Sequence, residues 1–92
     1  MRVARRYVIA GRVQGVGFRY FAEHVAGREG VHGWVRNLPN GTVEALIEGE
    51  TSSVDRVEAA LRRGPAGARV DDVTVEDVPP TGRATGFSIR LR

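Results

Sequence analysis

The spacing of the apolar residues alternates along this chain between a period of two and a period of 3.6, and this succession restricts the fold more than any other feature. Within residues 3–13, Val3, Tyr7, Ile9 and Val13 share one parity and Arg6 and Arg12 the other, which predicts a half-buried strand. From Phe18 onwards, apolar residues recur at intervals of three and four, which predicts a helix. We expect Gly30 to end that helix, because glycine readily adopts the left-handed backbone of a helix C-terminus.

The next segment predicts a β-hairpin. Val31 to Leu38 has the composition of a strand, and Val43, Ala45 and Ile47 alternate along another. Between them, Leu38-Pro39-Asn40-Gly41 has proline at the second turn position and glycine where a positive φ is needed.

The rest of the chain predicts a helix and two strands. We expect the helix to begin at Ser52, with Asp55 completing a capping arrangement, and to end at Gly64-Pro65. Residues 70–78 then predict a strand, and residues 87–91 a short final strand.

The predicted order is therefore β-α-β-β-α-β followed by a short extra strand. Two helices of about three turns cover only one face of a sheet, which favours a ferredoxin-like α+β sandwich. We expect an antiparallel sheet with both helices on one face. A chain of 92 residues leaves room for one domain, so we assign residues 1–92 to it.

The basic residues exclude two kinds of chemistry. All 14 are arginine, because the chain contains no lysine, and the net charge is only +3. The absence of lysine rules out a Schiff-base mechanism and a lysine-dependent P-loop. A surplus this small gives no support for a nucleic-acid partner.

Other absences indicate the compartment. The chain has no cysteine, and therefore neither disulfides nor thiolate chemistry. No run of about 18 apolar residues indicates a transmembrane helix, and the N-terminus lacks an apolar signal segment. We therefore expect a cytoplasmic protein that does not bind a membrane.

One stretch has the pattern of an anion site. Gly11-Arg12-Val13-Gln14-Gly15-Val16-Gly17-Phe18-Arg19 leads from a strand through a glycine-bearing loop into a helix. Such a loop directs backbone N–H groups inward, and the helix start adds the positive end of its dipole. Arg19 in the first turn suits two oxygens of one anion. The alternative is an ordinary tight connection in which Arg19 pairs with Glu23 one turn later.

A second stretch, Gly33-Trp34-Val35-Arg36-Asn37-Leu38-Pro39-Asn40-Gly41-Thr42-Val43, ends a strand at a polar residue. Taken alone, Asn37 is most simply a residue that caps the turn, and Trp34 a packing residue that partly covers the surface. The two histidines, His24 and His32, are more simply solvated surface residues than metal ligands.

Together these stretches resemble a known family. The first, with Ile9, resembles the acylphosphatase signature, and the second, extended to Gly49, resembles the other signature of that family. Gly86-Phe87-Ser88-Ile89-Arg90 resembles its C-terminal strand. The resemblance covers essentially the whole chain, and only the final Leu91-Arg92 differs from the aromatic ending of animal members.

The resemblance implies a ferredoxin-like fold and hydrolysis of acyl phosphates to a carboxylate and phosphate. It assigns phosphate binding to the loop and the helix start: Gln14, Gly15, Val16, Gly17, Phe18 and Arg19. It also implies that Asn37 holds the attacking water, so that Arg19 and Asn37 are the catalytic residues. No cofactor and no metal are implied. The expected partners are a small acyl phosphate and, as loop ligands, inorganic phosphate or sulfate.

Two other functions belong to different classes. Ferredoxin-like sheets also bind RNA, but this sequence lacks an aromatic pair on its central strands. A non-catalytic domain that binds phosphate or carbamoyl phosphate within a larger assembly also resembles the family. We expect the chain to be complete and freestanding, which favours the enzyme, acting as a monomer.

Overall fold

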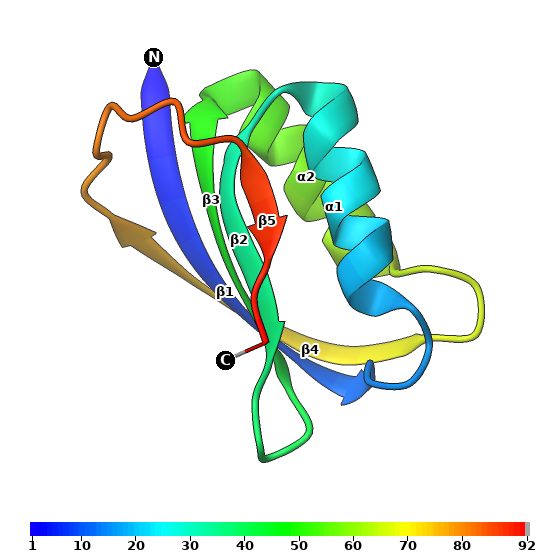
Figure 1. Cartoon of the computed structure of the whole chain (residues 1–92). Coiled ribbons are helices and arrows are strands. Elements are labelled where there is room, and N and C mark those ends of the chain that lie inside the picture. Colours follow the sequence, from blue (N-terminus) through cyan, green and yellow to red (C-terminus); the bar gives the residue numbers. More distant parts are fainter. Residues whose placement is uncertain (92) are drawn as a thin grey trace.

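The computed structural model describes residues 1–91, and its elements follow the predicted order (Figure 1). In chain order the elements are β1 (Arg2–Arg12), α1 (Phe18–Glu29), β2 (His32–Asn37), β3 (Val43–Glu50), α2 (Thr51–Arg63), β4 (Arg69–Val78) and β5 (Phe87–Ile89). Within residues 1–91, neither helix combines the length and the apolar character that crossing a bilayer requires.

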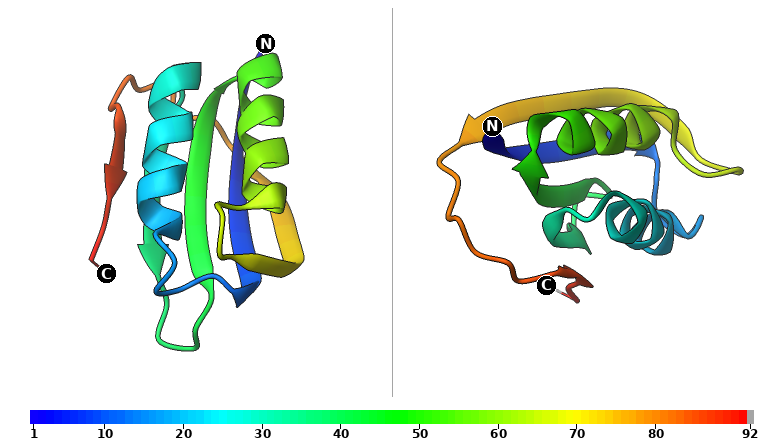
Figure 2. Two further views of the ribbon diagram at one scale, coloured as in Figure 1. Left: turned by 90° about the vertical axis from the view of Figure 1, so that its right-hand side faces the viewer. Right: turned by 90° about the horizontal axis from the view of Figure 1, so that it is seen from above.

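The strands form one sheet in the order β4-β1-β3-β2-β5. β1 pairs antiparallel with both β3 and β4, and β2 pairs antiparallel with β3. Both helices lie side by side on the same face of this sheet (Figure 2). The antiparallel sheet with two helices on one face is therefore confirmed. The short final strand differs from it in direction, because β5 pairs with β2 in parallel.

The core lies between the sheet and the helices. One parity of β1 and β3 points into it, so that Tyr7, Ile9 and Ile47 are fully buried. Phe18 and Leu61 reach the same layer from the two helices. The alternation read in the sequence is thus the alternation between a helix-covered face and an open face of the sheet.

A buried carboxylate attaches the segment before β5 to the open face. Glu48 accepts hydrogen bonds from the backbone N–H groups of Thr81 at 3.0 Å and Gly82 at 2.8 Å, and from Arg2 Nε at 2.7 Å. Burial raises the pKa of Glu48, but these hydrogen bonds outweigh burial and lower the pKa to about 2. The ionised carboxylate therefore fixes the loop that delivers β5 to the edge of β2.

Three predicted details of the second helix and the last strand are wrong. α2 begins at Thr51, not Ser52, and has no side-chain cap hydrogen bond. Asp55 instead accepts a hydrogen bond from Arg5 of β1 at 2.7 Å, so tertiary pairing takes the carboxylate that capping would use. β5 ends at Ile89, before Leu91.

Candidate active site

A cavity of ≈ 220 Å³ lies where the β1–α1 loop meets the end of β2. It is lined by Val13, Gln14, Gly15, Gly17, Phe18, Arg19, Tyr20 and Asn37. The fold thus brings the two sequence stretches together, since Asn37 is 18 positions beyond Arg19 in the chain. Of the predicted site residues, Val16 alone does not line this cavity; it packs against the core instead.

The loop has the backbone that its glycines permit. Gly15 and Gly17 adopt φ angles of 73° and 77°, in the left-handed region, as the sequence predicts. A Cβ atom at either position would meet no other atom within 4 Å, so the need for glycine comes from backbone conformation and not from crowding. These two turns direct the chain around the cavity and into α1.

The N-terminus of α1 leaves its N–H groups without acceptors among the residues that the structure describes. Gly17 is the N-cap residue, no side chain caps the helix, and the first turn contains no acidic residue. Within residues 1–91, no hydrogen bond has the backbone N–H of any residue from 15 to 20 as its donor. Uncapped N–H groups at the positive end of a 12-residue helix suit an anion.

Arg19 is half-buried in the wall of the cavity. It forms no ion pair among residues 1–91, so the predicted alternative, pairing with Glu23, is not found. The guanidinium is therefore a positive charge that no carboxylate of the described chain neutralises. Its charge adds to that of the helix terminus.

Gln14 has a role that sequence reasoning missed. Its Nε2 donates to the carbonyl oxygen of Leu38 at 2.8 Å and to that of Thr42 at 3.0 Å. Both of its amide protons are thereby used in attaching the loop to the β2–β3 turn. The Gln14 side chain thus holds the loop against the turn, and any contact with an anion falls to its backbone.

Asn37 does not cap the turn that follows it. Its Oδ1 atom is buried and has no hydrogen-bond partner within residues 1–91. The Oδ1 of Asn40 caps the turn instead, accepting from the backbone N–H of Thr42 at 3.1 Å. The turn-capping interpretation of Asn37 is therefore wrong. A buried acceptor without a partner is rare, and here it lies in the wall of the cavity.

A charge cluster on the open face holds the end of β2 in register. Glu44 of β3 accepts from Arg6 Nε at 2.5 Å and from Arg36 Nε at 2.6 Å. Burial raises the pKa of Glu44, but these two hydrogen bonds outweigh burial and lower it. Arg36 is the neighbour of Asn37, so this cluster fixes the strand that positions the asparagine. Each of these three residues lies on the parity of its strand that is opposite to that of the core residues. That alternation was the signal by which the sequence could have placed them on the open face.

The remaining predictions concern Trp34, His24 and His32. Trp34 is half-buried, with Arg36 and Arg90 stacked at 5.2 Å and 4.6 Å from its ring centroid, as expected of a residue that partly covers the surface. His24 is exposed as predicted, but His32 is half-buried and its Nδ1 accepts from the N–H of Gly86 at 2.8 Å. Residues 1–91 contain no group of three or more His, Cys, Asp or Glu side chains placed to hold a metal ion.

Comparison with known proteins agrees with the fold and identifies the family. The family model for acylphosphatases matches residues 5–89. An acylphosphatase of Anaeromyxobacter dehalogenans is 52% identical over 90 residues, which are 98% of this chain and 97% of that protein. The crystal structure of acylphosphatase from Bacillus subtilis has a TM-score of 0.92 and 35% identity, and the match covers 97% of this chain and 99% of that one.

A larger protein contains a similar unit. Full-length HypF, solved in a phosphate- and nucleotide-bound form, matches 98% of this chain with a TM-score of 0.85 and 26% identity. The match covers only 12% of the HypF chain. The relatives in the preceding comparison are instead matched over nearly their whole length.

The fold and the relatives show which class of protein this is: a ferredoxin-like α+β hydrolase with a small-molecule substrate. The chain belongs to the acylphosphatase family and is an enzyme that hydrolyses acyl phosphates. The family resemblance read from the two sequence stretches is thereby confirmed.

The left-handed loop predicts the effect of one glycine substitution. Gly15→Val places a β-branched side chain at a φ of 73°, which costs about 1 kcal/mol or more of stability if the backbone holds. If it relaxes, the N–H groups are redirected. We therefore expect weaker competitive inhibition by inorganic phosphate, with a lower melting temperature. Gly27→Val, within α1 and at an ordinary helical φ, is the control for the added side chain, and it should leave both the melting temperature and phosphate inhibition close to wild type. Unchanged phosphate inhibition in Gly15→Val would show that the loop amides do not bind the anion.

Proposed function

We propose that the N–H groups of residues 15–20 and the Arg19 guanidinium bind the phosphoryl group of an acyl phosphate, and that Asn37 holds the attacking water. The supporting observation is that unpartnered groups of both kinds meet in one cavity. N–H donors and a free guanidinium lie on the loop and helix side, and a buried carbonyl acceptor, Asn37 Oδ1, lies on the strand side. The donors match an anion, and the acceptor matches a water proton.

In the proposed reaction the water oxygen attacks phosphorus and the bond from phosphorus to the carboxylate oxygen breaks. The electron pair of that bond leaves with the carboxylate. One water proton stays on the new phosphate oxygen and the other passes to a second phosphoryl oxygen, giving dihydrogen phosphate. The leaving carboxylate has a conjugate acid with a pKa near 4, so no residue is needed to protonate it.

Arg19 and the loop amides would act mainly on charge. Phosphoryl transfer passes through a loose transition state with charge spread over the equatorial oxygens. Fixed N–H groups and a guanidinium stabilise that charge without reorganising during the reaction. Inorganic phosphate and sulfate carry similar oxygens, so they are expected to compete for the same anion cradle, which consists of the loop N–H groups and the Arg19 guanidinium. We also propose that the enzyme acts as a monomer, because the proposed site needs no residue from a second copy.

The test of metal-independent hydrolysis uses benzoyl phosphate. We expect the purified chain to release phosphate from it at the same rate with and without a chelator. We also expect much slower reaction with an alkyl phosphate monoester, since an alkoxide leaving group needs a proton that no group proposed here supplies. A rate that falls with chelator and returns with magnesium would contradict metal-independent catalysis. Phosphate binding without turnover would contradict the proposed role of the cavity.

A further inference from the structure

One residue that lines the cavity is an exposed tyrosine. Tyr20 is 67% exposed, yet it lines the same cavity as Arg19 and Asn37. Large apolar side chains with this exposure are few in residues 1–91, the others being Met1 at 88% and Leu91 at 87%. The catalytic role proposed above uses Arg19 and the backbone and leaves this ring without a function.

The helix geometry places Tyr20 on the side of α1 that faces away from the sheet. Phe18 faces the sheet and is 2% exposed, and Tyr20, two residues further, is rotated from it by about 200°. Tyr20 therefore leaves α1 on the side away from the sheet. Helical side chains also lean toward the N-terminus, so the ring extends over the loop that precedes α1. Asn37 belongs to the sheet and thus forms the floor of the cavity, whereas Tyr20 forms its outer rim.

In-line displacement then fixes the direction of the acyl group. The attacking water and the leaving oxygen lie on opposite sides of phosphorus. With the water held at the floor by Asn37, the acyl group of a phosphate bound in the loop points outward, to the rim. The side chain that it meets there is Tyr20.

We propose that Tyr20 is a specificity-determining residue that binds the acyl group, and that the preferred substrates are acyl phosphates with a flat, apolar acyl group. This inference rests on the function proposed above, including the water at Asn37. An exposed phenol ring gains contact area when a flat apolar group covers it, and a pair of aromatic rings gains more than that area alone provides. A methyl group in the place of the ring covers little of this surface.

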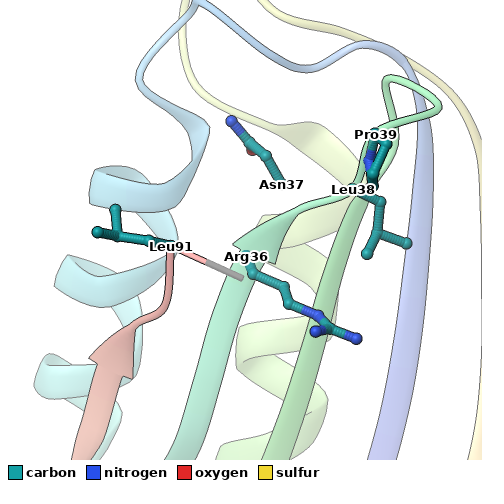
Figure 3. Close-up of a pocket in the computed structure, with 5 residues that line it drawn as sticks. All are labelled: Arg36, Asn37, Leu38, Pro39 and Leu91. Atoms are coloured by element: carbon teal, nitrogen blue, oxygen red, sulfur yellow. The ribbon is translucent and has the colours of Figure 1, made fainter.

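A neighbouring cavity of ≈ 450 Å³ is larger but lies on the wrong side for the leaving group. It is lined by Arg36, Asn37, Leu38, Pro39 and Leu91 (Figure 3). Figure 3 shows the Asn37 side chain pointing away from those of Arg36 and Leu38. Arg36 precedes Asn37 in β2 and lies on the open face, where it binds Glu44. An acyl group that departs from the side opposite Asn37 does not enter this cavity.

The experiment compares benzoyl phosphate with acetyl phosphate. We expect Tyr20→Ala to lower kcat/KM for benzoyl phosphate by about tenfold, and for acetyl phosphate by less than about twofold, because only the larger group covers the ring. Tyr20→Phe keeps the ring. It is expected to retain the wild-type ratio of kcat/KM for benzoyl phosphate to kcat/KM for acetyl phosphate. The inhibition constant of inorganic phosphate, which has no acyl group, should not change in either variant.

Two control variants make the result specific. His24→Ala removes another exposed side chain of α1 that does not line the cavity, and it should keep the wild-type ratio. Leu91→Ala alters the larger cavity and should also keep it. An unchanged ratio in Tyr20→Ala, or loss of the ratio in Leu91→Ala, would overturn the role of Tyr20 while phosphate release by the wild type still supports the proposed function. A wild type that hydrolyses neither substrate would overturn both.

Discussion

Replacing Arg19 with alanine is expected to lower turnover of benzoyl phosphate by about a thousandfold or more, the scale of an arginine that stabilises a phosphoryl transition state. The loss should extend to inorganic phosphate binding, because the guanidinium faces the phosphoryl charge before as well as during the reaction. The fold should survive, since Arg19 forms no ion pair among residues 1–91. The measurements are kcat, the phosphate inhibition constant and the melting temperature.

Two further variants distinguish the contribution of the paired N–H donors of the guanidinium from that of its charge. Arg19→Lys keeps the charge but loses the paired N–H donors, and we expect it to restore little activity. Arg28→Ala removes an arginine from the last turn of the same helix and should behave like wild type. If Arg19→Lys were nearly as active as wild type, the planar geometry of arginine would not matter here. If Arg19→Ala behaved like Arg28→Ala, Arg19 would have no part in the reaction.

The fold was predictable because most of its elements are specified by local pattern. The parity of Tyr7 and Ile9 identified the buried face of β1, and Gly30 ends α1 with a φ of 70° as predicted. The errors arose where a structural detail depends on contacts with residues far away in the sequence. Asp55 has the local pattern of a capping residue, but Arg5 of β1, 50 residues away in the sequence, lies within hydrogen-bond distance of it. The direction of β5 depends on the path of the loop that Glu48 binds. The spacing of apolar residues within the strand contains no information about that path.

For the cavity residues, the backbone conformation could be predicted from the sequence, but the side-chain contacts could not. Glycines at positions 15 and 17 indicated the left-handed turns that the structure contains. Gln14 was read correctly as part of the loop, but the target of its amide lies 24 and 28 residues away, at Leu38 and Thr42. For Asn37 the local pattern favoured a turn cap, and only the resemblance to a family favoured a catalytic role. The structure shows why the pattern misled, since Asn40 makes the cap.

Replacing Asn37 with alanine is expected to lower kcat by about a hundredfold or more, which is the scale of losing a contact that positions a reactant. The amide is neutral and contributes little to holding a phosphate dianion, so competitive inhibition by inorganic phosphate should stay close to wild type. This pattern is the reverse of the Arg19→Ala pattern, in which binding and turnover fall together. Because Oδ1 makes no hydrogen bond within residues 1–91, the substitution breaks no described contact of that atom.

Asn37→Asp and Asn40→Ala complete the test. The aspartate keeps an acceptor for water but repels the anionic substrate, so we expect no recovery of kcat and weaker phosphate inhibition. Asn40→Ala removes the turn cap made through Thr42, and it should lower the melting temperature while leaving kcat near wild type. If Asn37→Ala lost phosphate inhibition but kept turnover, Asn37 would belong to the anion cradle. If it lost only melting temperature, as Asn40→Ala should, its role would be structural, and the water at the floor of the cavity would need another residue to hold it.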